Sequence, residues 1–167
     1  MCKMICRAYL DIETTGLSRT YADLTVVGLA FERRNKCTVL QLVGDQISTQ
    51  RLIELVKKAQ VLYTYNGSRF DLPFIKAKLG LDLREHIAHK DLMYECWRRN
   101  LYGGLKAVER KLGIARKTQG IDGRMAVKLW YDYQNYGNRK SLALLLQYNK
   151  EDVLNLPVLR KKLNVCV

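Results

Sequence analysis

The first 43 residues hold three apolar segments of strand length, and these segments limit the possible fold more than any other feature of the chain. Residues 23–31 and 36–43 are rich in β-branched and other apolar side chains, and the polar stretch 32–35 between them is typical of a β-hairpin. Residues 5–12 form the third segment. Strands joined by short connections pair antiparallel, so we expect the chain to begin with three antiparallel strands.

Strands and helices alternate after residue 43. Apolar periodicity predicts helices over 49–59, about 72–79, 92–100, 104–112, 123–135 and 140–163, and short strands over 60–64 and 86–90. Ser48 or Thr49 and Asp91 are expected helix caps, and Gly80 is an expected stop. Pro157 is expected to kink or restart the last helix, because proline lacks a backbone donor. The predicted fold class is α/β, with a mixed five-stranded sheet, antiparallel in its first three strands, flanked by helices.

The whole chain, residues 1–167, is expected to form a single domain. Its length suits one domain, no internal repeat interrupts it, and only two prolines occur. Hydrophobic residues make up 48 % of the chain, which is typical of a globular protein. No segment reaches the apolar length needed to span a bilayer, and residues 1–6 lack the features of a signal peptide, so no membrane location is expected.

Charge favours a polyanionic partner. The chain has 29 Lys and Arg against 16 Asp and Glu, a formal net charge of +13. Nucleic acid is the partner we expect from this excess. A basic protein without such a partner is the alternative that charge alone leaves open. An anionic membrane surface is less favoured, because no basic amphipathic helix stands apart from the core pattern.

The cysteines indicate a reducing compartment. Five are present, no Cys-x-x-Cys pair occurs, and no Cys/His cluster has the spacing of a zinc site. We therefore expect reduced thiols in a cytoplasmic protein, with a Cys2–Cys6 disulfide as the alternative.

Two acidic residues stand on the first predicted strand, Asp11 and Glu13. Because side chains alternate along a strand, both share one face, while Leu10 and Ile12 point into the core. Neighbouring carboxylates repel each other unless a cation lies between them, and hard divalent cations take oxygen ligands. The segment therefore indicates either a metal site or a solvated strand end.

Two later segments carry further carboxylates. Asp71 follows a strand and the turn pair Asn66-Gly67, and it opens a predicted helix, where it is expected as a metal ligand or only as a cap. Tyr148 and Asp152 are four residues apart, so on a helix they lie on one face. An ordinary amphipathic helix with a half-buried tyrosine is the alternative for that segment.

Together the three segments resemble the ordered exonuclease motifs of the DEDD family, in its tyrosine subclass. The matching residues are Asp11 and Glu13 for the first motif, Asn66, Phe70 and Asp71 for the second, and Tyr148 and Asp152 for the third. The histidine subclass carries His five residues before the last Asp, where this chain has Gln147, so His86 and His89 are not the expected general base. Residues 65–74 are similar to the proofreading domain of family B DNA polymerases. Residues 5–160 resemble the free-standing YprB-type ribonuclease H-like domain, a predicted exonuclease.

The resemblance implies a ribonuclease H-like fold and 3′–5′ exonuclease hydrolysis of single-stranded DNA or RNA with two divalent cations, Mg²⁺ or Mn²⁺. It implies that Asp11 bridges both ions, that Glu13 and Asp152 complete the site that activates water, and that Asp71 holds the second ion. Tyr148 is expected to orient the attacking water with an ordinary pKa of about 10.

The resemblance also implies contacts with the terminal nucleotides of the substrate. The expected contact residues are Thr14, Thr15, Leu17, Asn66, Arg69 and Phe70. Several basic residues near the motifs, among them Lys106 and Arg116, are candidates to follow the nucleic-acid strand, whereas most of the charges are expected to form a solvated face. Three alternatives stay open: an endonuclease of the same fold, a non-catalytic nucleic-acid-binding module, and a subunit that works only with other DNA- or RNA-processing proteins.

Overall fold

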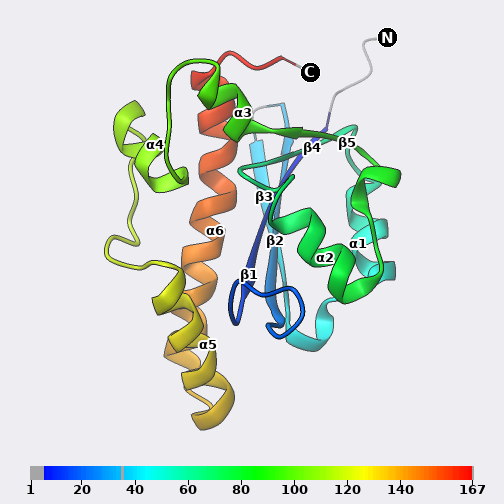
Figure 1. Cartoon of the computed structure of the whole chain (residues 1–167), viewed down its shortest axis with the longest axis vertical. Helices are drawn as coiled ribbons and strands as arrows, with labels where there is room; N and C mark the ends of the chain where they lie inside the picture. Colours follow the sequence, from blue (N-terminus) through cyan, green and yellow to red (C-terminus); the bar gives the residue numbers. More distant parts are fainter. Residues whose placement is uncertain (1–5, 35, 167) are drawn as a thin grey trace.

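A mixed sheet forms the centre of the molecule. The computed structural model describes residues 6–34 and 36–166, and within these ranges five strands lie in the order β3-β2-β1-β4-β5 (Figure 1). β1 (Arg7–Thr14), β2 (Leu24–Arg33) and β3 (Lys36–Val43) pair antiparallel. β4 (Val61–Thr64) and β5 (Ala88–Asp91) add to β1 in parallel. The predicted mixed sheet with three antiparallel strands is confirmed.

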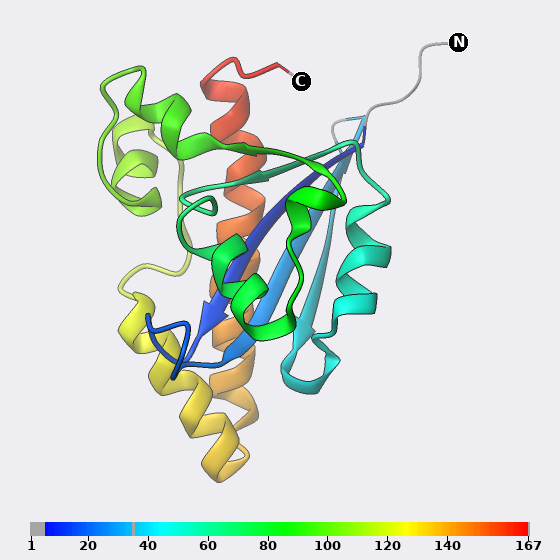
Figure 2. The same ribbon diagram turned by 45° about the vertical axis from the view of Figure 1, so that its right-hand side comes forward.

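Helices cover both faces of this sheet (Figures 1 and 2). α1 (Thr49–Val56) and α2 (Asp71–Leu79) pack on one face. α3 (Leu92–Trp97), α4 (Leu105–Leu112) and the long α6 (Arg139–Lys162) pack on the other, and α5 (Gly123–Tyr136) lies along α6. Two short 3-10 helices, Gly44–Gln46 and Leu83–Glu85, complete the fold.

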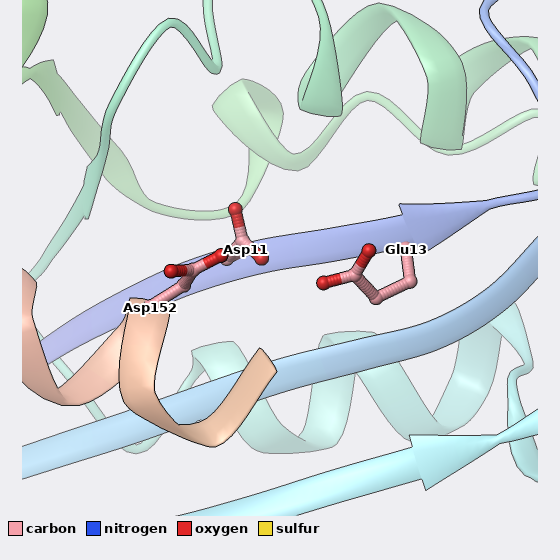
Figure 3. A group of neighbouring side chains, drawn as sticks. All are labelled: Asp11, Glu13 and Asp152. Carbon is pink, nitrogen blue, oxygen red and sulfur yellow. The ribbon is translucent and has the colours of Figure 1, made fainter. Parts of the chain in front are cut away.

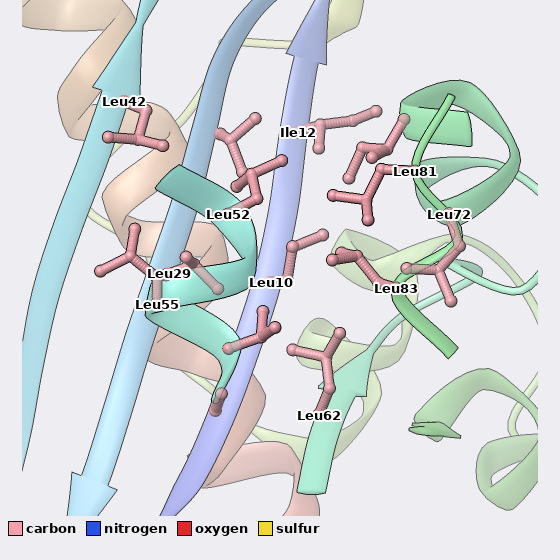
Figure 4. Packing of buried hydrophobic residues seen from close by; sticks show 14 of the residues in the cluster. Leu10, Ile12, Leu29, Leu42, Leu52, Leu55, Leu62, Leu72, Leu81 and Leu83 are labelled. Atoms are coloured by element: carbon pink, nitrogen blue, oxygen red, sulfur yellow. The ribbon is translucent and has the colours of Figure 1, made fainter. Parts of the chain in front are cut away.

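The central strand β1 separates two hydrophobic clusters. Leu10 and Ile12 are buried with α1 and α2 on one face, as Figure 4 shows. Tyr9 is buried on the other face with residues of α3, α4 and α6. Because side chains alternate along the strand, Asp11 and Glu13 must then face α6 rather than α1.

The β2–β3 hairpin differs from the prediction. Residues 32–35 were expected to join the strands, but β2 continues to Arg33, and Glu32 pairs with Cys37 in the sheet. Glu32 is buried, and its carboxylate accepts a hydrogen bond of 2.6 Å from the Tyr9 hydroxyl and another from Arg160. Glu32 is therefore polar because it pairs with buried polar groups, and not because it lies in a turn.

Helix boundaries follow the predicted signals closely. The side chain of Ser48 caps α1, that of Asp91 caps α3, and Gly80 ends α2 with φ of 65°. The helix predicted over 92–100 is shorter than expected. It ends at Trp97, and the next turn closes with Asn100 in the left-handed region at φ of 57°.

Pro157 does not restart the last helix. α6 runs from Arg139 to Lys162 as one element that contains this proline. Val153, Leu156 and Leu159 on either side of Pro157 are buried in the cluster beneath the sheet. We attribute the continuity to this packing, which holds the helix where local preference would break it.

Four of the five cysteines fall in the part of the chain that the structure describes. Cys6, Cys37, Cys96 and Cys166 are free thiols. Cys2, the other half of the alternative disulfide, lies outside the described residues, as does residue 5 of the first predicted strand. Among the described helices, none is long and apolar enough to cross a bilayer.

Candidate functional site

Three carboxylates from distant parts of the sequence meet where α6 crosses the sheet. Asp11 and Glu13 come from β1, and Asp152 comes from α6 (Figure 3). Each contributes an oxygen atom to a group in which all of these atoms lie within 4.8 Å of one another. The sequence predicted this convergence of the first and third segments, and the structure brings them together.

The electrostatics of this group are unfavourable without a cation. Burial is the largest cause that raises the pKa of Asp11 and of Glu13 well above the usual range of carboxyl groups. The negative charges of Asp152 and of the other nearby carboxylates raise both pKa values further. Two unit charges at 4.8 Å repel by about 3 kcal/mol at an effective dielectric constant of about 20. Glu13 Oε1 is also buried without a hydrogen-bond partner among the described residues. An all-oxygen cluster with an unsatisfied buried acceptor fits a hard divalent cation.

Asp71 lies beside this group but is not a member of it. It stands at the start of α2, and its Oδ1 accepts a hydrogen bond of 3.1 Å from the backbone amide of Ile12 on β1. Burial raises its pKa to about 7, and its charge in turn raises the pKa of Asp11. Phe70, not Asp71, occupies the N-cap position of α2, so the helix-cap alternative for Asp71 is wrong. The Asp71 carboxylate instead forms a hydrogen bond with β1 at Ile12, the residue after Asp11.

The turn before α2 is fixed by Asp91. The carboxylate of Asp91 accepts hydrogen bonds from the backbone amides of Asn66, at 2.8 Å, and Ser68, at 2.9 Å. Asn66 takes a left-handed conformation with φ of 61°. At Gly67 a Cβ atom would lie 2.3 Å from the Thr64 side chain, so only glycine fits there. The sequence had assigned Asp91 only the cap of α3, whereas it also holds the loop that presents Asp71.

Tyr148 lies in the same pocket as two of the carboxylates. A cavity of about 260 Å³ has a lining made up of Asp11, Tyr65, Gly104, Leu105, Lys106, Tyr148 and Asp152. The Lys106 ammonium lies 4.3 Å from the centre of the Tyr148 ring, and burial lowers the pKa of Lys106. Burial and the neighbouring carboxylates raise the pKa of Tyr148 well above the ordinary value that we had expected. Its hydroxyl therefore stays protonated at neutral pH.

Asn149 is a residue of the site that the sequence did not reveal. Its side-chain nitrogen donates to the carboxylate of Asp11 at 3.0 Å and to the Asp11 carbonyl at 3.2 Å. Its oxygen accepts a hydrogen bond of 2.9 Å from Gln41 on β3. Asn149 is fully buried, and Gly28 on β2 leaves the space for it. The one available signal was its position directly after Tyr148.

Arg116, a candidate contact to the nucleic-acid strand, lies instead against two carboxylates. Its guanidinium pairs with Asp152 and with the buried Glu109, and its side chain is only 10 % exposed. The charge of Arg116 opposes the effect of burial on Asp152, whose pKa still rises to about 6. Arg116 is thus part of the carboxylate site rather than of the open surface.

A second cavity, of about 420 Å³, adjoins Glu13. Its lining includes Thr14, Leu17, Phe70 and residues 122–124 and 127 at the start of α5. Leu17 is 85 % exposed at the edge of this cavity. Leu17 and Phe70 thus lie near the Glu13 carboxylate, in the lining of one cavity.

The other expected contact residues mostly lie outside the lining of this cavity or use their polar groups in local hydrogen bonds. The Thr14 hydroxyl donates to the Gly16 carbonyl at 2.7 Å, and the Thr15 hydroxyl accepts from the Asp23 amide at 2.8 Å, so both hydroxyls close their own loop. Arg69 is exposed, and its carbonyl accepts from Arg19. Thr15, Asn66 and Arg69 are not among the residues that line the cavity beside Glu13.

His89 lies at the edge of the sheet, outside the carboxylate group. Its Nε2 atom is 2.8 Å from the Thr64 hydroxyl, and burial lowers its pKa. His89 is therefore held by β4 rather than by a residue of the carboxylate group.

Known structures resemble this chain over nearly its whole length. The family B DNA polymerase of the archaeon Pyrobaculum calidifontis superposes with a TM-score of 0.72 at 18 % identity, covering 96 % of this chain and 24 % of the polymerase. A nuclease in its apo form gives a TM-score of 0.64 at 22 % identity, covering 97 % and 72 %. NrnC of Brucella melitensis with bound Mg²⁺ gives 0.64 at 20 % identity, covering 96 % and 72 %. These TM-scores show a common fold.

The family is given by sequence. No curated protein matches the chain. A family profile described as RNase_H superfamily matches residues 8–164, which include every carboxylate of the site and all of the five strands except Arg7, the first residue of β1. The sheet order and its flanking helices agree with that assignment. The chain therefore has a ribonuclease H-like fold and belongs to the RNase H superfamily.

Proposed function

We propose that this protein is a 3′–5′ exonuclease of the tyrosine-containing DEDD type, related to the YprB-type domains, that hydrolyses single-stranded DNA or RNA with two divalent cations, Mg²⁺ or Mn²⁺. The observation that carries the proposal is the convergence of Asp11, Glu13 and Asp152, whose oxygens lie within 4.8 Å of one another. The adjacent Asp71 supplies a fourth carboxylate. A structural neighbour, NrnC, has been observed with bound Mg²⁺ and bound to pGG, which supports both the ion and the substrate class.

Each residue of the site has a role that follows from its position. When bound, two divalent ions supply an acidic water and neutralise charge on the leaving oxygen. Asp11 would contribute to the binding of both ions, Glu13 and Asp152 would complete the binding of one, and Asp71 would help to hold the other. Tyr148 keeps its proton and orients the attacking water by its hydroxyl. Asn149 holds the Asp11 carboxylate through its amide.

The substrate contacts follow from the two cavities. The cavity beside Glu13, with Leu17 and Phe70 in its lining, receives the 3′-terminal nucleotide. Lys106, which lines the cavity with Asp11 and Tyr148, faces the phosphate that follows. Thr14, Thr15, Asn66 and Arg69 act at the rim through backbone or side-chain contacts. The net charge of +13 supports a polyanionic substrate.

The proposal also covers the extent of the domain, its location in the cell and its partners. We propose that residues 1–167 act as one exonuclease domain, since the family profile spans residues 8–164. The free described thiols support a cytoplasmic location. Other DNA- or RNA-processing proteins are proposed as partners that deliver the substrate.

Digestion of 5′-labelled single-stranded DNA and RNA in Mn²⁺ tests this function. We expect a ladder of products shortened from the 3′ end, and a loss of roughly a thousandfold in rate for Asp11→Ala, because ion stabilisation of the transition state amounts to several kcal/mol. Lys128→Ala, an exposed change on α5 outside both cavities, is the matched control and should cut normally.

Two outcomes distinguish the alternatives. Cleavage of a circular single strand would indicate an endonuclease. Binding that persists in EDTA, with no cleavage in Mn²⁺, would indicate a non-catalytic module. Equal rates in the wild type and in Asp11→Ala would contradict the assigned site.

A further inference from the structure

Arg116 connects three elements at the carboxylate site. It lies in the connection between α4 and α5, and it donates one hydrogen bond through Nη2 to Oδ1 of Asp152 on α6. Its other terminal nitrogen, Nη1, donates to both carboxylate oxygens of Glu109 on α4, at 2.9 Å and 2.7 Å. One guanidinium therefore joins a proposed metal ligand to a helix that carries no metal ligand.

Glu109 is the unusual member of this set. It is 0 % exposed, although α4 has a solvent face that accommodates the charges of Arg110 and Lys111. Besides Arg116, Asn155 of α6 donates to Glu109 at 2.9 Å. A buried ion pair rarely stabilises a fold more than apolar side chains of the same size would. Stability alone thus gives no reason to place this pair here, and a role at the neighbouring Asp152 does.

The segment around Arg116 is fixed on α6 by a separate set of bonds. The carboxylate of Glu151 accepts hydrogen bonds from the backbone amides of Lys117 and Thr118, and from the Thr118 hydroxyl. Glu151 and Asp152 are neighbours in sequence, so the same helical turn holds both the backbone and the side chain of this segment. Arg116 is consequently held in place from two sides.

We propose that Arg116 is a positioning residue that fixes the orientation of Asp152 for divalent-ion binding, and that Glu109 is the buried counter-charge that holds Arg116. This inference rests on the proposed metal site. With Oδ1 of Asp152 held by Arg116, Oδ2 is left for the ion beside Asp11 and Glu13. Hydrogen-bonded partners of this kind orient metal ligands, and their removal typically weakens metal binding by about 10- to 100-fold.

The test measures Mn²⁺ affinity directly, by electron paramagnetic resonance of the free ion. Arg116→Met alone would leave Glu109 buried and unpaired, so the informative protein is the double variant Glu109→Gln/Arg116→Met, which removes both charges together. Circular dichroism and thermal melting establish that it is folded. The matched control is Lys117→Met, the exposed neighbour of the same charge, whose backbone bond to Glu151 is retained.

We expect the folded double variant to bind Mn²⁺ about 10- to 100-fold more weakly than the wild type, with the control unchanged. Arg116→Lys should lie between them, because lysine supplies a charge but not the forked geometry of arginine. Wild-type affinity in the folded double variant would overturn the role of Arg116 while leaving the metal site intact. Failure of the wild type to bind Mn²⁺ would instead overturn the proposed function.

Discussion

At the scale of single residues, the main feature of this protein is a cluster of buried and half-buried carboxylates. Asp11, Glu13 and Asp152 lie close enough to repel one another strongly, and neither a solvated strand end nor an ordinary amphipathic helix requires that arrangement. Asp71 and Asp152 keep pKa values of about 7 and about 6 because burial disfavours their charged forms. The same oxygens become favourable neighbours once a divalent cation lies between them.

This charge group makes the stability of the metal-free protein depend on pH. A folded carboxyl with a raised pKa keeps its proton where the unfolded chain has released it. Its stabilisation is complete below the ordinary carboxyl pKa of about 4 and is lost as the pH rises through the folded value. In EDTA, we expect the melting temperature to fall from about pH 5 to about pH 8, and Asp71→Asn to flatten that decline.

Added Mn²⁺ should reverse the trend, because metal ligands bind in their deprotonated form. The difference in melting temperature between Mn²⁺ and EDTA should therefore grow as the pH rises through about 6 to 7. A melting curve that responds to neither pH nor Mn²⁺ over this range would contradict the coupling of these carboxyls to an ion.

Gly28 tests the placement of Asn149. A Cβ atom at position 28 would lie 2.2 Å from Asn149 Oδ1, so Gly28→Ala must displace the amide that holds Asp11. We expect a loss of about 1–3 kcal/mol in the free energy of unfolding in urea, as for other overpacked cores. Gly123→Ala, at the start of α5 with open space around its Cβ, should change it by less than about 0.5 kcal/mol. Equal effects of the two changes would argue against this packing.

How far the site could be predicted differs from residue to residue. Strand alternation places Asp11 and Glu13 on one face, and helical spacing does the same for Tyr148 and Asp152, so these needed no coordinates. The contacts of Arg116 with Glu109 and Asp152, like that of Asn149 with Gln41, join segments whose relative position depends on tertiary packing. No local pattern in the sequence contains that information.

At the scale of elements, β1 and α6 provide most of the site residues. A buried hydrogen-bond network also connects β1 to α6, nearer the start of β1 and the end of α6 than the carboxylates are. The Tyr9 hydroxyl of β1 donates to Glu32 of β2 at 2.6 Å and accepts from Arg160 of α6 at 2.8 Å. The end of β2 and a restart of α6 at Pro157 were element predictions that failed. Both failed because long-range burial, not local preference, decides them.

Tyr9→Phe removes only the hydroxyl of this network. We expect a loss of about 1–3 kcal/mol in the free energy of unfolding, because buried Glu32 and Arg160 each lose a partner. Tyr63→Phe is the matched control. Its ring stacks on Tyr9 at 5.3 Å between centroids, and its hydroxyl is buried without a hydrogen-bond partner among the described residues. Urea unfolding should show little change for Tyr63→Phe, and an equal loss in both would refute the role of the network.

At the scale of the whole molecule, the fold and the charge point to the same substrate class. The order of strands and helices was predictable, because apolar periodicity and turn signals change at each element. The family profile and the structural neighbours agree with that order. The net charge of +13 is summed over all 167 residues. It attracts a polyanion at distances up to about the Debye length, beyond which salt screens the interaction.

Binding of single-stranded nucleic acid should depend steeply on salt. If about four phosphates are contacted, the logarithm of the binding constant should fall with the logarithm of salt concentration with a slope of about −3. Fluorescence anisotropy of a labelled oligonucleotide with the Asp11→Ala protein, which should bind without cutting, measures this slope. A slope near zero would contradict an electrostatic contribution to substrate binding.

The central claim is that the carboxylates of β1, α2 and α6 hold divalent ions. Anomalous X-ray diffraction from crystals of the wild-type protein soaked in Mn²⁺ tests it most directly. We predict one anomalous peak among Asp11, Glu13 and Asp152, a second on the Asp71 side of Asp11, and neither peak in crystals of Asp11→Ala. Crystals that contain Mn²⁺ elsewhere but show no anomalous density at these oxygens would contradict the account.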